Sequence, residues 1–356
     1  MEIQKRIQSL DVLRGAIMVL MAIDHVRVYA GVPAGGPDPA VFFTRWVTHF
    51  CAPGFAFFAG TAAFLYGIKL GSPSALARYL FTRGFMLVIL EITLIRLFWT
   101  FNLDLGDFML AGVIWMLGWC MVLLGTMVRM NAKTIGIIGL AIIFFQQLFG
   151  YVSTNAYWQF IYTSAEQGPS WIAILYVIIP WIGVMMAGYG FGEVLLLEES
   201  KRNRLCYVIG IGSILSFIII GSFYIDYSKP FIFQLLNQRK YPASQLYLMM
   251  TLGPLIALIP WAEKAKGAIV NFFSVFGKVP FFYYLAHILI IHISALVVNY
   301  FLFGDVHQDW YNTAPFAQVP PESKWSLGLL YFVFAIDVTI LYFISKWYSK
   351  RKLKFL

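Results

Sequence analysis

The side chains most able to do chemistry in this sequence are ionisable residues inside apolar segments. The first apolar segment contains Asp11, Arg14, Asp24 and His25, and an ionisable group at the centre of a bilayer costs a few kcal/mol or more. On a helix, Arg14 and His25 project from one face, about 16 Å apart along the axis. The segment therefore offers a cation that can hold an anion, with Asp11 one turn away to pair with it, and an imidazole that can act as a base.

Two further segments contain candidates of the same kind. His49 begins the second apolar segment at the depth expected for His25, so the two imidazoles could share a cavity. The third segment places Glu91 near mid-depth and Arg96 in the outer half, where a cation could bind an acceptor or stabilise a developing oxyanion. The structural alternatives are an interfacial hydrogen bond for His49 and ion pairs with other helices for Glu91 and Arg96.

A later segment contains His287 and His292, which lie five residues apart and so about 140° apart around a helix. Both cannot face one small ligand, which argues against a metal or haem site, and packing roles are the alternative. We assign both to the substrate-binding residues, with one of them lining the cavity. Lys240 and Tyr241, in an outer loop, complete this group because aromatic and cationic side chains can stack on and hydrogen-bond a sugar; an interfacial aromatic belt would explain them as well.

The elements that must position these residues are predicted to be membrane-spanning helices. The 356 residues are 60% hydrophobic and only 12% charged, too apolar for a soluble domain. We expect an all-α, polytopic transmembrane helix bundle that forms one integral membrane domain over residues 1–356. About ten spans of near 20 residues are predicted: 10–30, 46–68, 84–101, 108–128, 134–151, 171–192, 206–225, 244–261, 279–302 and 325–346.

Charge and small residues give the expected orientation and packing. Most of the 26 lysines and arginines fall in segments on the same side as the N-terminus, so both termini are expected to be cytoplasmic. The net charge of +9 therefore reflects membrane topology, and no nucleic-acid partner is expected. Gly183, Gly188 and Gly192 should permit close helix contact. The three cysteines lie in or beside apolar segments, where we expect buried thiols without disulfides or metal.

Several motifs along the whole chain resemble one family. They are RIQSLDVLRG at 6–15, RWVTHFCAPGF at 45–55, PWIG at 180–183, KYPAS at 240–244, TLGP at 251–254 and VPFFYYLAH at 279–287. The sequence is similar to bacterial membrane proteins related to the catalytic domain of heparan-alpha-glucosaminide N-acetyltransferase. The first motif also resembles the wider membrane acyltransferase superfamily, in which an arginine precedes a histidine by eleven positions, as Arg14 precedes His25.

The resemblance implies an acyl-CoA-dependent N- or O-acetyltransferase of the bacterial inner membrane. Acetyl-CoA from the cytoplasm would be the donor, with Arg14 and Asp11 on its binding side, and an amino or hydroxyl group of a sugar or glycan on the outer side would be the acceptor. His25 would be the general base. Asp24 or His49 would fix its tautomer, and Arg96 would offset charge on the intermediate.

Some features stay open at the level of the sequence. Lysosomal members carry a histidine in the outer loop before the second span, where residues 31–44 have none, so either His25 or His49 takes its place or the chemistry differs. A transporter or flippase for a small anionic or glycan solute is the alternative function, since buried charges also mark solute pathways. A non-catalytic membrane scaffold is a third. The acceptor, acyl-histidine versus direct transfer, and oligomeric state, a homodimer included, are undetermined.

Overall fold

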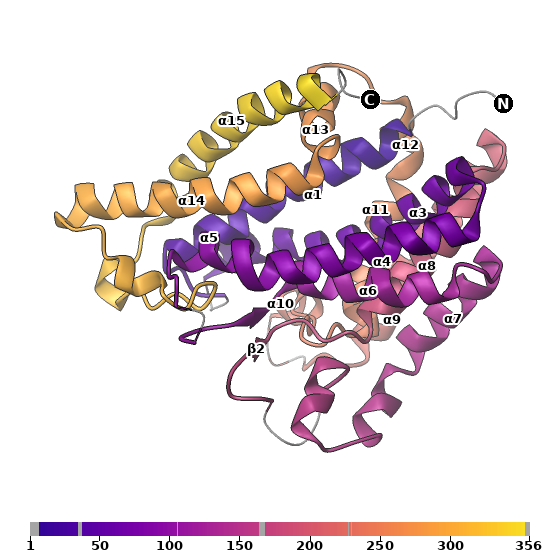
Figure 1. Ribbon diagram of the computed structural model, residues 1–356, viewed down its shortest axis with the longest axis horizontal. Coiled ribbons are helices and arrows are strands. Elements are labelled where there is room, and N and C mark those ends of the chain that lie inside the picture. Colours follow the sequence, from indigo (N-terminus) through magenta and orange to yellow (C-terminus); the bar gives the residue numbers. More distant parts are fainter. Residues whose placement is uncertain are drawn as a thin grey trace. The chain divides into compact units, whose positions relative to one another are not determined.

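The computed structural model describes residues 7–34, 38–104, 106–163, 168–226, 228 and 230–352 (Figure 1). Nearly all regular structure in these residues is helical. The only strands described are β1 (Leu110–Ala111) and β2 (Ala173–Ile174), which pair in parallel with Leu110 opposite Ala173. The prediction of a predominantly helical fold is therefore confirmed.

The chain divides into two compact units. Among the described residues, the first unit lies within 52–92 and 109–260, and the second lies within 7–51, 93–108 and 261–352. Each is described separately.

The first unit is built mainly from helices. They are α3 (Cys51–Leu70), α4 (Pro73–Leu90), α6 (Val113–Met127), α7 (Ala132–Phe144), the 3₁₀ turns η3 (Gln146–Tyr151) and η4 (Ala156–Phe160), α8 (Trp181–Leu195), α9 (Glu199–Ser222), α10 (Phe231–Leu236), α11 (Gln245–Ala257) and α12 (Ile259–Lys264), of which α3 and α12 extend past the unit's limits. The pairs α7 with α8, α4 with α6 and α9 with α11 make the most extensive contacts.

Small residues let these helices approach closely. A Cβ atom added to Gly183 of α8 would lie 2.7 Å from the carbonyl oxygen of Gly139 in α7, and one at Gly188 would lie 2.0 Å from that of Phe57 in α3. At Gly192 the added atom would lie 2.3 Å from the ring of Phe64. These contacts confirm the close packing predicted for the three glycines of α8.

The second unit is organised around α1 (Gln8–Tyr29). Its other elements are α2 (Pro39–Trp46), the 3₁₀ turn η1 (Val47–Phe50), α5 (Arg96–Thr100), α13 (Ala268–Gly277), α14 (Pro280–Phe303), the 3₁₀ turns η5 (Gln308–Tyr311) and η6 (Pro321–Ser323), and α15 (Leu327–Lys352). A π-helical segment, η2 (Glu91–Ile95), joins α4 to α5. The helices α13, α14 and α15 and the turn η1 all contact α1, and Figure 1 shows α1 (indigo) alongside α14 (orange).

The neighbours of α1 run in opposite directions. His287 contacts His25, and His292, further along α14, contacts Tyr29, further along α1, so α1 and α14 are parallel. The backbone N–H of Trp325, just before α15, donates to the carbonyl of residue 30, just after α1, so α15 is antiparallel to α1. This alternation is what consecutive membrane crossings require.

Helix α13 fits against α1 through two glycines. A Cβ atom at Gly15 would lie 1.9 Å from the carbonyl oxygen of Phe273, and one at Gly277 would lie 1.9 Å from that of Asp11. The two helices therefore pack backbone to backbone and run antiparallel. No element was predicted between the expected spans 244–261 and 279–302, because a ten-residue helix is too short to read as a crossing.

Among the residues that the structure describes, five helical segments are long and apolar enough to cross a membrane. They are Pro39–Leu70, Glu199–Ser222, Gln245–Lys264, Pro280–Phe303 and Leu327–Arg351. Several other expected spans are shorter helices here: the one predicted at 171–192 is helical only from Trp181, after β2. The ten crossings and the cytoplasmic position of both termini stay predictions.

Candidate functional site

The centre of the candidate site is a pair of histidines in the second unit. His25 lies in the last third of α1, and His287 lies in the second turn of α14. Helix α14 starts with Pro280, whose missing N–H is not needed in the first turn, and ends at Gly304 with a φ of +79°. The Nε2 atom of His287 lies 2.7 Å from Nδ1 of His25, and the ring centroids are 4.7 Å apart.

The hydrogen bonds determine which nitrogen carries each proton. Nδ1 of His287 lies 3.1 Å from the carbonyl oxygen of Tyr283, which can only accept, so this nitrogen donates. Nε2 of a neutral His287 is then an acceptor, and Nδ1 of His25 must donate to it. In neutral His25 the lone pair is consequently on Nε2, which is the basic atom of the pair.

Aromatic side chains surround the pair. Trp99 of α5 meets the ring of His25 edge-on at 4.6 Å, and its own ring is stacked on Tyr29 at 5.7 Å. The hydroxyl of Tyr29 donates to the backbone carbonyl of Trp99 at 2.6 Å. The hydroxyl of Tyr311 donates to the backbone carbonyl of Tyr29 at 3.1 Å. Burial raises the pKa of Tyr311 to about 12, so its hydroxyl keeps its proton and remains a donor.

His292 is positioned one turn further along α14. Its Nδ1 lies 2.9 Å from the carbonyl oxygen of Phe98 and its Nε2 lies 3.1 Å from Oε1 of Gln308. The amide of Gln308 donates to the carbonyl of Thr100 at 2.7 Å, and the ring of Phe101 stacks on the imidazole at 3.8 Å. His292 therefore ties α14 to the end of α5.

Asp24 forms an ion pair with Arg27 on the same helix. Its Oδ1 lies 2.9 Å from both Nε and Nη2 of Arg27, three residues later, and Nη1 of Arg27 donates to the carbonyl of Val32 at 2.7 Å. The pair connects the end of α1 to the segment that follows it. Nδ1 of His25 is oriented by the hydrogen bond that it donates to Nε2 of His287.

Arg96, at the start of α5, is buried and organises the loop after this helix. Its guanidinium donates to the carbonyl oxygens of Asn102, at 2.8 Å, and of Asp104 and Phe108. A guanidinium has five N–H donors and satisfies a tight loop well. The sequence-based assignment of Arg96 to oxyanion stabilisation stays a prediction.

Three other residues predicted from the sequence lie on α1 and on the neighbouring turn η1. Arg14 is half-buried and Asp11 is buried in the first half of α1, and the helix continues without interruption to His25. The axial separation of about 16 Å between Arg14 and His25 therefore holds. His49 is buried on η1, which packs against α1.

Lys240 and Tyr241 belong to the first unit and form an aromatic and cationic cluster there. The ammonium of Lys240 lies 5.2 Å from the ring centroid of Tyr241 and 6.0 Å from that of Tyr176, and the two rings meet edge to face at 5.3 Å. Lys240 is nearly buried, with 9% of its surface exposed. Burial raises the pKa of Tyr162, although Arg239, which precedes Lys240 in the chain, opposes this shift.

Glu91 has a structural role, as the sequence suggested, but its surroundings differ from the ion pair that was expected. Its buried carboxyl group lies at the start of α6, beside the backbone N–H groups of Gly112, Ile114 and Trp115. These N–H groups have no acceptor within their own helix, and a carboxyl oxygen can serve as one. The expected ion pair is thus replaced by a helix N-terminus, and a Cβ atom at position 112 would lie 2.0 Å from Oε1 of Glu91.

Metal coordination and thiol reactivity are two further kinds of chemistry that the described residues could support. The part of the chain that the structure describes contains no group of three or more His, Cys, Asp or Glu side chains that could hold a metal ion. Cys51, Cys120 and Cys206 are buried and are not joined in disulfides. The contributions of Trp99, Tyr29 and Gln308 were missed because each acts through a contact distant in the sequence.

Comparison with known proteins places the chain in a family. The family model described as "Heparan-alpha-glucosaminide N-acetyltransferase, catalytic" matches residues 6–225, which is more than half of the chain. The match includes Arg14, His25, His49 and Arg96 and ends before α14. None of the curated proteins compared matches the sequence.

Proposed function

The chain belongs to the heparan-alpha-glucosaminide N-acetyltransferase catalytic family, and we propose that it transfers an acetyl group from acetyl-CoA to an amino or hydroxyl group of a sugar. The family match supports a transmembrane acetyltransferase, and the five apolar helices support an integral membrane protein. We further propose that the donor is cytoplasmic, the acceptor is on the outer side and the membrane is a bacterial inner membrane.

The observation that carries the proposal is the hydrogen bond between His25 and His287. A general base needs a defined lone pair, and a second group that holds the ring in one tautomer supplies this. The chain of hydrogen bonds from the carbonyl of Tyr283 through His287 to His25 does so. His287 is accordingly proposed as the positioning partner of His25, a more specific role than substrate binding.

The reaction follows from this arrangement. The acceptor amine or hydroxyl attacks the thioester carbonyl, and its proton moves to Nε2 of His25 as the new C–N or C–O bond forms. Collapse of the tetrahedral intermediate breaks the C–S bond, and the imidazolium returns the proton to the departing thiolate. While His25 is protonated, its Nδ1–H remains bonded to Nε2 of His287, which stabilises the positive charge. In an acyl-histidine route the same lone pair attacks first.

Arg14 is proposed to hold a phosphate of CoA, with Asp11 supporting it. Its position about three turns before His25 on one continuous helix suits a pantetheine arm that reaches the imidazole. Asp24, through its ion pair with Arg27, would keep the end of α1 in place. His49 and Arg96 remain proposed contributors to the site, and Lys240, Tyr241 and His292 remain proposed for the acceptor.

The test measures binding and turnover separately. Purified protein in detergent is assayed for thermal unfolding with acetyl-CoA and for acetyl transfer from labelled acetyl-CoA to a panel of amino sugars. A ligand at a hundred times its Kd stabilises by about 2.7 kcal/mol. We expect Arg14→Ala to lose this stabilisation, and His25→Ala to keep it while turnover falls by about 10²–10⁴-fold.

The matched control is His307→Ala, because this histidine lies in an outer loop, stacked on Trp310. It should behave like the wild type in both assays. Wild-type turnover in His25→Ala would refute the base assignment. A folded wild-type protein that neither binds acetyl-CoA nor transfers its acetyl group would refute the proposed function and favour the transporter.

A further inference from the structure

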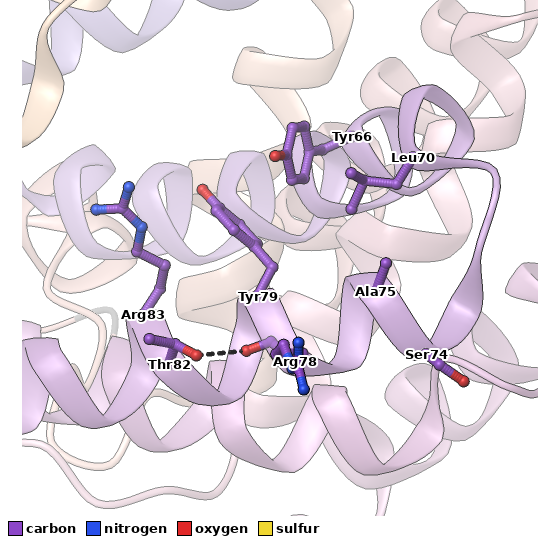
Figure 2. Close-up of a pocket in the computed structure, with 8 residues that line it drawn as sticks. All are labelled: Tyr66, Leu70, Ser74, Ala75, Arg78, Tyr79, Thr82 and Arg83. Carbon is purple, nitrogen blue, oxygen red and sulfur yellow. Dashed lines mark hydrogen bonds between the residues drawn. The ribbon is translucent and has the colours of Figure 1, made fainter.

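The first unit contains a cavity of about 670 Å³ where α3 ends and α4 begins (Figure 2). It lies along one side of both helices, next to the tight turn between them. Its polar and aromatic lining consists of two tyrosines, two arginines and two hydroxyl residues: Tyr66, Tyr79, Arg78, Arg83, Ser74 and Thr82. Nothing in the proposed acetyl transfer uses this cavity.

The charge of the cavity is positive and uncompensated. Arg78 and Arg83 are exposed, and neither is paired with a carboxylate among the residues the structure describes. The guanidinium of Arg83 lies over the ring of Tyr79 at 5.6 Å, and the rings of Tyr79 and Tyr66 are 4.5 Å apart. Figure 2 shows Tyr79 and Arg83 extending from α4 on the side where the Tyr66 ring lies. Two cations beside aromatic hydroxyls favour an anionic ligand with several oxygen acceptors.

The local backbone adds to this preference. Gly71 ends α3 with a φ of +64°, and the side chain of Ser72 accepts the N–H of Ala75 at 3.3 Å to start α4. The first turn of this 18-residue helix therefore borders the cavity. Its positive end contributes to the attraction of an anion, although the two arginines are the main source.

An apolar surface continues from the cationic end along α4. Arg78, Thr82, Phe85 and Ile89 follow at spacings of four, three and four residues, which places them on one face of the helix. All four are exposed, with Phe85 at 47% and Ile89 at 58%. A ligand bound here would meet cations at one end and bare hydrocarbon at the other, a pattern suited to a molecule with a charged head and an apolar chain.

We propose that this cavity binds the phosphate of an anionic phospholipid, with the acyl chains lying along Phe85 and Ile89. Basic pockets between membrane helices attract such headgroups, and the charge pattern assigns Arg78 and Arg83 to the cytoplasmic side, where anionic lipids are abundant. The exposed apolar surface of α4 favours a phospholipid over a soluble phosphate compound, because the soluble compound would leave Phe85 and Ile89 uncovered. The site is independent of the acetyl-transfer reaction.

The experiment compares two lipids of equal chain length. Delipidated full-length protein in detergent is titrated with dioleoylphosphatidylglycerol or dioleoylphosphatidylcholine, and binding is measured by native mass spectrometry. The wild type should bind the anionic lipid more tightly. Each cation near an anionic surface raises the affinity for an anionic lipid roughly fivefold. The double variant Arg78→Gln with Arg83→Gln should therefore lose a preference of roughly 25-fold for the anionic lipid. The variant with lysine at both positions should retain much of this preference.

Arg129→Gln is the matched control, since this exposed arginine lies beyond the end of α6 and outside the cavity. It should keep the wild-type preference. An unchanged preference in the double glutamine variant, or equal binding of the two lipids by the wild type, would overturn the proposal. Displacement of the bound anionic lipid by adenosine 3′,5′-bisphosphate would also overturn it, in favour of a soluble nucleotide. An unchanged Tm without added lipid shows that each variant is folded.

Discussion

Replacing Gly15 by alanine should separate two helices of the second unit. The added Cβ atom would lie 1.9 Å from the carbonyl oxygen of Phe273, whereas ordinary contact begins at 3.4 Å, so α1 and α13 must move apart by about 1.5 Å at this point. Overpacking of this kind costs about 1–3 kcal/mol. The contact is with backbone, which cannot rotate away as a side chain can. Because α1 also carries His25, acetyl transfer should fall together with stability.

The measurement is thermal unfolding in detergent, followed through tryptophan fluorescence. The matched control is Gly212→Ala in α9, where an added Cβ atom meets no heavy atom within 4 Å. In a helix interior this change is favourable by about 0.5–1 kcal/mol, so the control should melt at or above the wild-type Tm. If Gly15→Ala melts with the control, the backbone contact between α1 and α13 does not exist as described.

Two further variants test the other central contacts. His287→Ala removes the acceptor for Nδ1–H of His25, so the base loses its defined tautomer. We expect kcat to fall by about 10–100-fold while acetyl-CoA binding, measured as the control, is kept. A normal kcat would contradict the tautomer assignment. Glu91→Gln replaces the buried carboxyl group at the start of α6 by an amide and should lower the unfolding free energy by about 1–3 kcal/mol, because the amide brings N–H donors to a place that already holds N–H donors. The exposed Glu193→Gln is its control, and equal Tm values for these two glutamate variants would count against this role of Glu91.

Local features were predictable because they depend on nearest neighbours in the chain. Apolar length and composition indicated the helices that carry His25 and His287, and the eleven-residue spacing of Arg14 and His25 was meaningful because α1 is continuous. The glycines of α8 were recognised as contact points because small residues in an apolar helix have few other uses.

Other features were decided by contacts that no local pattern encodes. The five-residue spacing of His287 and His292 showed only that they face different directions. The partner of His287 is His25, and the partners of His292 are Gln308 and the end of α5; both sets of contacts depend on helix packing. The carboxyl group of Glu91 could have met a cation or a helix N-terminus, since both satisfy it. Helix α13 was missed because its length is below that of a crossing.

The sequence by itself determined that this is a helical membrane protein of an acetyltransferase family, with an arginine and a histidine on one face of its first helix, because composition, periodicity and motif are properties of the chain. Only the tertiary structure decided which residue orients that histidine. His25 and His287 are 262 positions apart, and the 2.7 Å hydrogen bond between them exists because α1 and α14 pack in parallel at a register set by the surrounding side chains.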